Sequence, residues 1–153
     1  MEKKRLTLLE ANFREQTILI EKIYRKIATR KKNYSSNESV LVDLAYQLHN
    51  LYCAFEDLFQ SVSDYFENHV IAQPAWHTEL LKRMRMHING IRPALISGST
   101  FELLDELRGF RHVFRHAYTI ELDAQKVKIV LQKALALKKI YKKDFARFLK
   151  QLK

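Results

Sequence analysis

The fold of this chain is decided by residues 41–62, which read LVDLAYQLHNLYCAFEDLFQSV. Apolar side chains recur in this stretch every three or four residues, which is the period of one face of an α-helix. The apolar positions are Leu41, Leu44, Ala45, Leu48, Leu51, Tyr52, Phe55, Leu58, Phe59 and Val62. The pattern predicts a long helix over about residues 39–68 that buries one face along its length.

The rest of the chain repeats this period in segments separated by polar or proline-containing breaks. We expect helices over residues 2–31 and 76–88, a helix that begins near residue 100, and a last helix over residues 124–151. Ser99 and Glu102 have the spacing of a capping box, and Asp123 can cap the last helix. The sequence therefore predicts an all-α, antiparallel bundle of four to five helices, with residues 1–153 as a single domain.

The composition agrees with a helical fold and narrows the environment. The 153 residues include only three Gly and two Pro. The one cysteine, Cys53, excludes an internal disulfide framework and is interpreted as a small buried apolar residue. We expect no signal peptide, because residues at the N-terminus are charged and lack an apolar core, and no run of 18 apolar residues exists to span a membrane. We expect a cytoplasmic protein.

The formal net charge of +10 is unevenly distributed. Residues 1–32 hold ten Lys and Arg against four Glu, a net +6, and residues 124–153 hold ten against Asp144 alone, a net +9. The middle of the chain, residues 33–123, has a net charge of −5. Basic end segments favour a polyanionic partner, either nucleic acid or an acidic protein, although charge that only aids solubility gives the same composition.

Residues 108–118, which read RGFRHVFRHAY, are the best candidate for a functional site in the chain. On a helix their five basic side chains share one arc of roughly 140°. They are Arg108, Arg111, His112, Arg115 and His116, and Tyr118 lies at the edge of this arc. We expect the opposite side to be buried through Leu103, Leu107, Phe110, Val113, Phe114 and Ala117.

Four kinds of site can be built from this Arg/His face. His112 and His116 have an i, i+4 spacing that can bind a metal, but the surrounding arginines repel a cation, and we expect no metal. Arginines can bind phosphate passively. Histidine and arginine can together cleave RNA without a metal, the histidine as general base and the arginine as the stabiliser of charge at phosphorus. The face can also pair with acidic residues of another helix or subunit.

Residues 111–118 fit the pattern Arg-x4-His-x-Tyr, which resembles the signature of HEPN-domain ribonuclease toxins of the HepT type. Residues 48–58 are similar to the long second helix of HepT-like proteins. The resemblance extends to the plan of the whole chain, because the motif lies on a late helix that one more long helix follows.

The resemblance implies an endoribonuclease toxin of a toxin–antitoxin pair that acts as a homodimer, with the motifs of two subunits forming one composite site. Arg111 would bind and polarise the scissile phosphate of RNA, and His116 would act on the 2′-OH or the leaving oxygen, leaving a 2′,3′-cyclic phosphate with no cofactor. Tyr118 would be AMPylated by a cognate minimal nucleotidyltransferase antitoxin. The added charge and bulk would then mask Arg111.

The chain departs from the family pattern in one place, because His112 stands where many HepT toxins have Asn. His112 can share the proton transfer or bind phosphate, and we expect Arg108 and Arg115 to add phosphate or RNA contacts, or to pair across the interface. Glu56 on the second helix can orient the motif arginine, or it can be an ordinary solvated or dimer-contact carboxylate. The alternative function is a non-catalytic HEPN adaptor that binds nucleotide or RNA for a partner nucleotidyltransferase. The remaining histidines, among them His49 and His77, are expected at the surface or partly buried.

Overall fold

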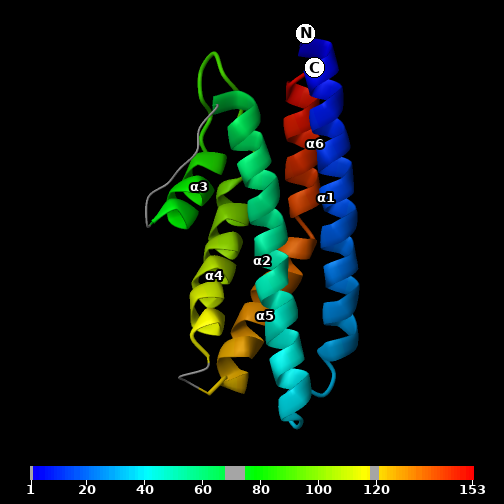
Figure 1. Cartoon of the computed structure of the whole chain (residues 1–153), viewed down its shortest axis with the longest axis vertical. Coiled ribbons are helices and arrows are strands. Elements are labelled where there is room, and N and C mark those ends of the chain that lie inside the picture. The colour runs from blue at the N-terminus through cyan, green and yellow to red at the C-terminus, as the bar shows by residue number, and fades with distance from the viewer. Residues whose placement is uncertain (1, 68–74, 118–120) are drawn as a thin grey trace.

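Six helices make up most of the described chain in this computed structural model, which describes residues 2–67, 75–117 and 121–153 (Figure 1). They are α1 (Glu2–Arg30), α2 (Glu38–Glu67), α3 (Trp76–Met84), α4 (Gly98–Arg115), α5 (Ala124–Lys138) and α6 (Tyr141–Gln151). Figure 1 shows α1 and α6 on one side of α2, α3 and α4 on the other, and both chain termini at the same end. The prediction of an all-α bundle is confirmed. No helix in the described ranges has the length and apolar character needed to cross a bilayer.

Helix α2 is the centre of the bundle. It packs against α1, α3, α4 and α5, and all ten apolar positions of its predicted stripe are buried. Phe55 contacts Tyr141 edge-to-face, with ring centroids 5.1 Å apart, and its ring also lies near Phe145. Burying so many large side chains on one helix is the main source of stability for this fold.

The predicted last helix is divided in two, which is why the bundle has six helices in place of four to five. Helix α5 ends at Lys138 and α6 begins at Tyr141. The N–H groups of Lys139 and Ile140 donate to carbonyls only three residues back, at 3.2 and 3.0 Å, so the last turn of α5 tightens. After this break Phe145 and Phe148 pack on Phe13 of α1.

The start of α4 differs from the predicted capping box. The N-cap is Ser97, whose Oγ accepts a hydrogen bond from the N–H of Thr100 at 3.2 Å. The buried carboxylate of Asp144 on α6 accepts the Ser97 N–H at 3.0 Å, the Ser97 O–H at 3.1 Å and the Thr100 O–H at 2.5 Å. Ser99 and Glu102 are therefore not the cap, because a side chain more than forty residues later organises this turn.

Helix α3 ends at Met84, four residues before its predicted end at Ile88. Ile88 instead donates its N–H to the carbonyl of Arg92 at 2.9 Å, which closes a tight turn around Gly90. Gly90 has a φ of 78°, a conformation that glycine adopts without strain. At the start of α5 the prediction is confirmed, because Asp123 Oδ1 accepts the N–H of Gln125 at 2.9 Å.

Candidate functional site

Helix α4 carries the predicted Arg/His face as far as Arg115, and His116 occupies the C-cap position. The buried positions of α4 are Thr100, Leu104, Leu107 and Phe110. Val113, which was expected in the core, is 40% exposed because it lies over the groove between α4 and α5. Tyr118 lies outside the described residues.

Arg111 lies against α2 and is only partly exposed. Its charge helps to lower the pKa of His49, for which burial is the larger cause, and it opposes the effect of burial, which raises the pKa of the Cys53 thiol. The guanidinium is therefore close to both side chains of α2. Its Nε atom is buried and has no hydrogen-bond partner among the described residues. A buried donor of this kind without an acceptor is unusual in proteins.

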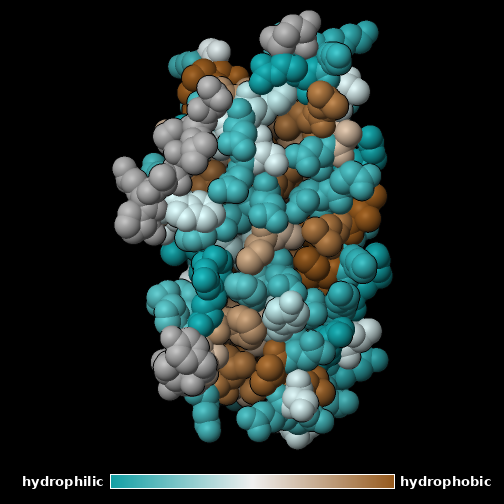
Figure 2. Space-filling model, in the orientation of Figure 1, coloured by the Kyte–Doolittle hydropathy of each residue, from teal (hydrophilic) through white to brown (hydrophobic). Residues whose placement is uncertain are grey.

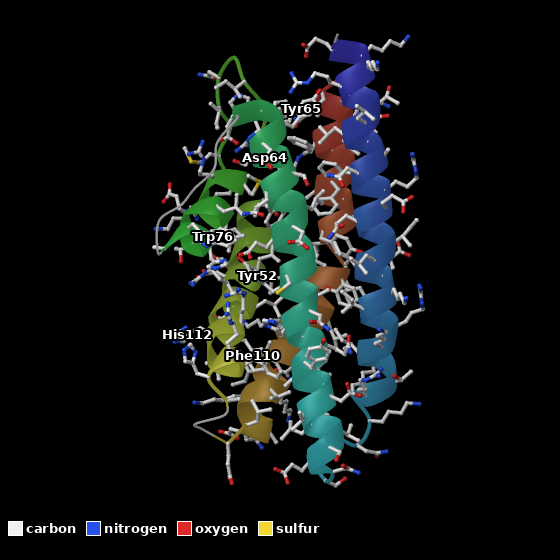
Figure 3. The ribbon with its side chains drawn as sticks, viewed as in Figure 1. Tyr52, Asp64, Tyr65, Trp76, Phe110 and His112 are labelled. Carbon is white, nitrogen blue, oxygen red and sulfur yellow. The ribbon has the colours of Figure 1, made fainter. Side chains whose placement is uncertain are left out.

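His112 and His116 lie together in the last turn of α4 and at its C-cap, with ring centroids 4.4 Å apart. Figure 3 shows His112 on the outer side of α4. The Nδ1 atom of His116 lies 2.9 Å from the carbonyl oxygen of His112. Because a carbonyl only accepts, Nδ1 carries the proton, and in the neutral ring Nε2 is the basic nitrogen. Both histidines line a cavity of about 170 Å³ beside residues 121–127.

The two residues of the Arg-x4-His pattern therefore leave α4 in different directions. Arg111 lies against α2, whereas His116 lines the cavity on the side of residues 121–127. The helix accounts for this separation, since five residues at 100° each place the second side chain roughly 140° around the axis from the first.

The other two arginines of the face differ in their surroundings. Arg108 donates to the carboxylate of Asp105 through Nη2 at 2.8 Å and Nε at 2.9 Å. Arg115 is exposed, and with His112 it lies in the last helical turn. Cations in that turn interact favourably with the unpaired carbonyls at the helix C-terminus, which is a structural reason for part of this charge.

Glu56 is buried and paired with a histidine of α3. Its Oε2 lies 2.7 Å from Nδ1 of His77, whose ring contacts Trp76. Burial is the main cause that raises the pKa of the neighbouring Tyr52, with Glu56 adding to it and Arg108 and Arg111 opposing it. The acidic residue of α2 and the arginines of α4 thus act on the same tyrosine.

His77 is the residue that sequence reasoning missed. It is 21 residues from Glu56 and on another helix, so neither spacing nor periodicity connects the two. Over the ranges that the structure describes, no group of three or more His, Cys, Asp or Glu side chains has the arrangement to hold a metal ion.

A long central helix packed against a late helix with an Arg-x4-His face defines a HEPN-like helical protein. Comparison with family models gives a match over residues 43–152 to the family described as HepT-like protein. The chain belongs to the HepT-like family. No curated protein and no solved structure matches it.

Proposed function

We propose that this protein is a metal-independent endoribonuclease toxin, active as a homodimer and controlled by a cognate nucleotidyltransferase. The observation that carries the proposal is the state of the two motif side chains. Arg111 keeps a buried N–H donor without a partner among the described residues, and His116 is held by its Nδ1–H so that Nε2 is its basic atom. These are the groups that cleavage of RNA at the 2′-OH requires.

In this mechanism the guanidinium of Arg111 binds the non-bridging oxygens of the scissile phosphate. Nε2 of one His116 takes the proton of the 2′-OH, and the 2′ oxygen attacks phosphorus. The bond to the 5′ oxygen breaks, and the imidazolium of the second copy's His116 protonates that oxygen. The products are a 2′,3′-cyclic phosphate and a 5′-OH, and protons balance over the two histidines.

The remaining residues of the face assist binding. Arg108, His112 and Arg115 add contacts to flanking phosphates, which strengthens binding without base specificity. Glu56, which is held by His77 on the side of α2 that faces α4, serves as a positioning residue for Arg111 in this proposal. A Glu56→Gln variant therefore weakens catalysis more than RNA binding.

An apolar groove beside the motif supports the homodimer. A groove of about 330 Å³ between the start of α2 and the end of α4 is lined by the apolar residues Leu41, Val42, Phe114, Ala117 and Leu122 and by the carboxylates Glu38 and Glu121. Figure 2 shows hydrophobic side chains gathered at this end of the molecule. Val42 is 46% exposed there, and we propose that a second copy covers it.

Catalysis is tested with Arg111→Ala and His116→Ala. We expect each variant to lose about 10²–10⁴-fold in the rate of RNA cleavage, the range for one oxyanion-type donor or one general base. Arg14→Ala, which removes an exposed arginine of α1, is the control and should cleave like wild type. Wild-type rates in both motif variants would refute the catalytic assignment. Purified protein that binds RNA without cutting it in EDTA would identify the adaptor function instead.

The dimer is tested with Val42→Asp. We expect this variant to sediment as a monomer and to lose cleavage, because a carboxylate in an apolar interface is desolvated without a partner. Ile18→Asp is matched to it, since Ile18 is equally apolar and 54% exposed on α1. If Val42→Asp stays dimeric and active, the interface lies elsewhere.

Control by the nucleotidyltransferase is tested with Tyr118→Phe. We expect this variant to stay toxic and to escape neutralisation, because it has no hydroxyl to receive AMP. Mass spectrometry that finds AMP only on another residue of the wild-type protein would refute the modification site.

A further inference from the structure

The Arg/His face leaves the two basic ends of the chain without a role, and the fold brings them together. Figure 1 shows α1 and α6 side by side. Ion pairs join them at two places, Lys142 to Glu21 at 2.9 Å and Lys153 to Glu10 at 3.2 Å. Helices α1 and α6 therefore bring basic side chains from both ends of the chain to one side of the bundle, and such a concentration of positive charge attracts a polyanion.

The break between α5 and α6 opens a pocket in this basic side. Its volume is about 200 Å³, and it is lined by Glu21, Tyr24, Arg25, Lys138, Tyr141 and Lys142. Three of these side chains are cationic and one is anionic, so the pocket wall has a formal charge of +2. The ammonium of Lys138 lies 5.8 Å from the centre of the Tyr24 ring, which forms an aromatic wall.

The hydroxyl of Tyr141 is the part of the pocket that most favours a ligand. Tyr141 is fully buried, and its hydroxyl has no hydrogen-bond partner among the described residues. By contrast, the hydroxyl of Tyr24 beside it donates to the carbonyl of Ala134 at 2.8 Å. An unpaired buried hydroxyl costs free energy, so an acceptor that reaches it is favoured.

The protonation state of this hydroxyl follows from its surroundings. Burial and, to a smaller extent, the Glu21 carboxylate raise the pKa of Tyr141 to about 12. At neutral pH the hydroxyl therefore keeps its proton and can donate, and Tyr141 and Glu21 both line the pocket. The charge of Lys142 has a partner in Glu21, and this pair is exposed enough to open when a stronger anion arrives.

We infer that the pocket between α1, α5 and α6 binds the phosphate group of a nucleotide, with Arg25, Lys138 and Lys142 as its cationic contacts and the Tyr141 hydroxyl as its neutral donor. A phosphate offers several strong acceptor oxygens and two charges, which suits a pocket with this many donors. The site is on the opposite side of α2 from the Arg/His face, and it does not depend on ribonuclease activity. Its ligand is either a free nucleotide or a phosphate of bound RNA.

Two double variants of equal charge test the site. Lys138→Ala/Lys142→Ala removes two lysines that line the pocket, and Lys139→Ala/Lys143→Ala removes their sequence neighbours, which do not. Binding of AMP is measured by calorimetry, with adenosine as the ligand that lacks the phosphate. Binding of a short DNA oligonucleotide, which has no 2′-OH to attack, is measured by fluorescence anisotropy over a series of salt concentrations.

We expect the pocket variant to weaken binding about tenfold or more, because charge-assisted hydrogen bonds are removed, and the neighbour variant to weaken it less than about twofold. For the oligonucleotide, the slope of log K against log salt should fall by about one for each phosphate that a removed lysine neutralised. Selective loss of AMP binding identifies a free nucleotide as the ligand, and selective loss of oligonucleotide binding alone identifies the nucleic-acid backbone. Equal weakening in both double variants, or no binding of either probe by the wild type, overturns the inference.

Tyr141→Phe removes only the hydroxyl and separates the ligand role from a structural one. We expect the urea midpoint of unfolding to stay at the wild-type value or to rise, because no hydrogen bond of the described fold is lost. Probe binding should weaken several-fold. A variant that unfolds more readily and binds normally would show that the hydroxyl serves the core. The same binding assays on Arg111→Ala show whether the pocket works when the proposed active site does not.

Discussion

Replacement of Asp144 by alanine should strongly destabilise this protein, because its buried carboxylate joins α6 to the first turn of α4. One Asp144 oxygen accepts three hydrogen bonds, from the N–H and O–H of Ser97 and the O–H of Thr100, and the other accepts Arg147 at 3.0 Å. Hydrogen bonds to a charged group contribute about 1.5–3 kcal/mol each, but they are not additive. We expect Asp144→Ala to cost about 3–5 kcal/mol, the range for removing one partner of a buried ionic network.

Two further variants calibrate this value. Asp144→Asn keeps one acceptor oxygen for Ser97 and Thr100 and loses the ion pair, so we expect a cost of about 1–3 kcal/mol. Asp43→Ala removes the partner of Arg30, a pair in which the aspartate side chain is 45% exposed, and should cost less than about 1 kcal/mol. Urea unfolding followed by circular dichroism gives the three values, provided that the m-value is unchanged.

A local measurement checks the mechanism behind the number. Asp144 holds the first turn of α4, so hydrogen exchange at residues 98–101 should speed up in Asp144→Ala well before the rest of the bundle opens. If Asp144→Ala costs no more than Asp43→Ala, the capping network does not stabilise the fold and the reasoning is refuted.

Three other perturbations have defined outcomes. Burial lowers the pKa of His49, so the unfolded chain binds more protons than the folded chain between the two pKa values. The free energy of unfolding should therefore fall as pH drops below about 6.5, and it should fall less in His49→Gln. Urea midpoints measured over a series of pH values check this. His77→Ala should lower the free energy of unfolding by about 1–3 kcal/mol, because it leaves the buried Glu56 carboxylate unpaired. Adding Glu56→Gln should recover part of that loss, and strict additivity of the two changes would contradict the pairing. Asp105→Asn should change stability by less than about 1 kcal/mol and tighten oligonucleotide binding by freeing Arg108, whereas unchanged affinity would remove Arg108 from the RNA contacts.

The helices could be predicted from the sequence, but some of their ends could not. The α2 stripe was found because each of its apolar residues is buried at helical spacing. The break between α5 and α6 left no such signal, because Leu137, Tyr141, Phe145 and Phe148 keep the helical period across it and all four are buried. Periodicity reports which side chains face the core, and both halves of the divided helix face the same core.

The cap of α4 shows a second limit. Ser99 and Glu102 satisfy the local rule, yet Ser97 is the cap because Asp144 of α6 holds its N–H and its hydroxyl. A capping rule that considers only neighbouring residues does not include a carboxylate from another helix. The Glu56–His77 pair is of the same kind, since only the packing of α3 on α2 brings the two side chains together.

The geometry of α4 gives the strongest reason to expect a site shared by two subunits. Arg-x4-His spacing places the two side chains roughly 140° apart on an α-helix. In this structure Arg111 accordingly lies against α2, and His116 lines the cavity on the side of residues 121–127. A general base must come within hydrogen-bond reach of the 2′-OH proton while the arginine holds the adjoining phosphate. Within one copy of α4 the arginine and the histidine point in different directions. When two copies of α4 face each other across a two-fold axis, the arginine of one can meet the histidine of the other. The spacing that looks unfavourable within one subunit is thus the spacing that a symmetric interface can use.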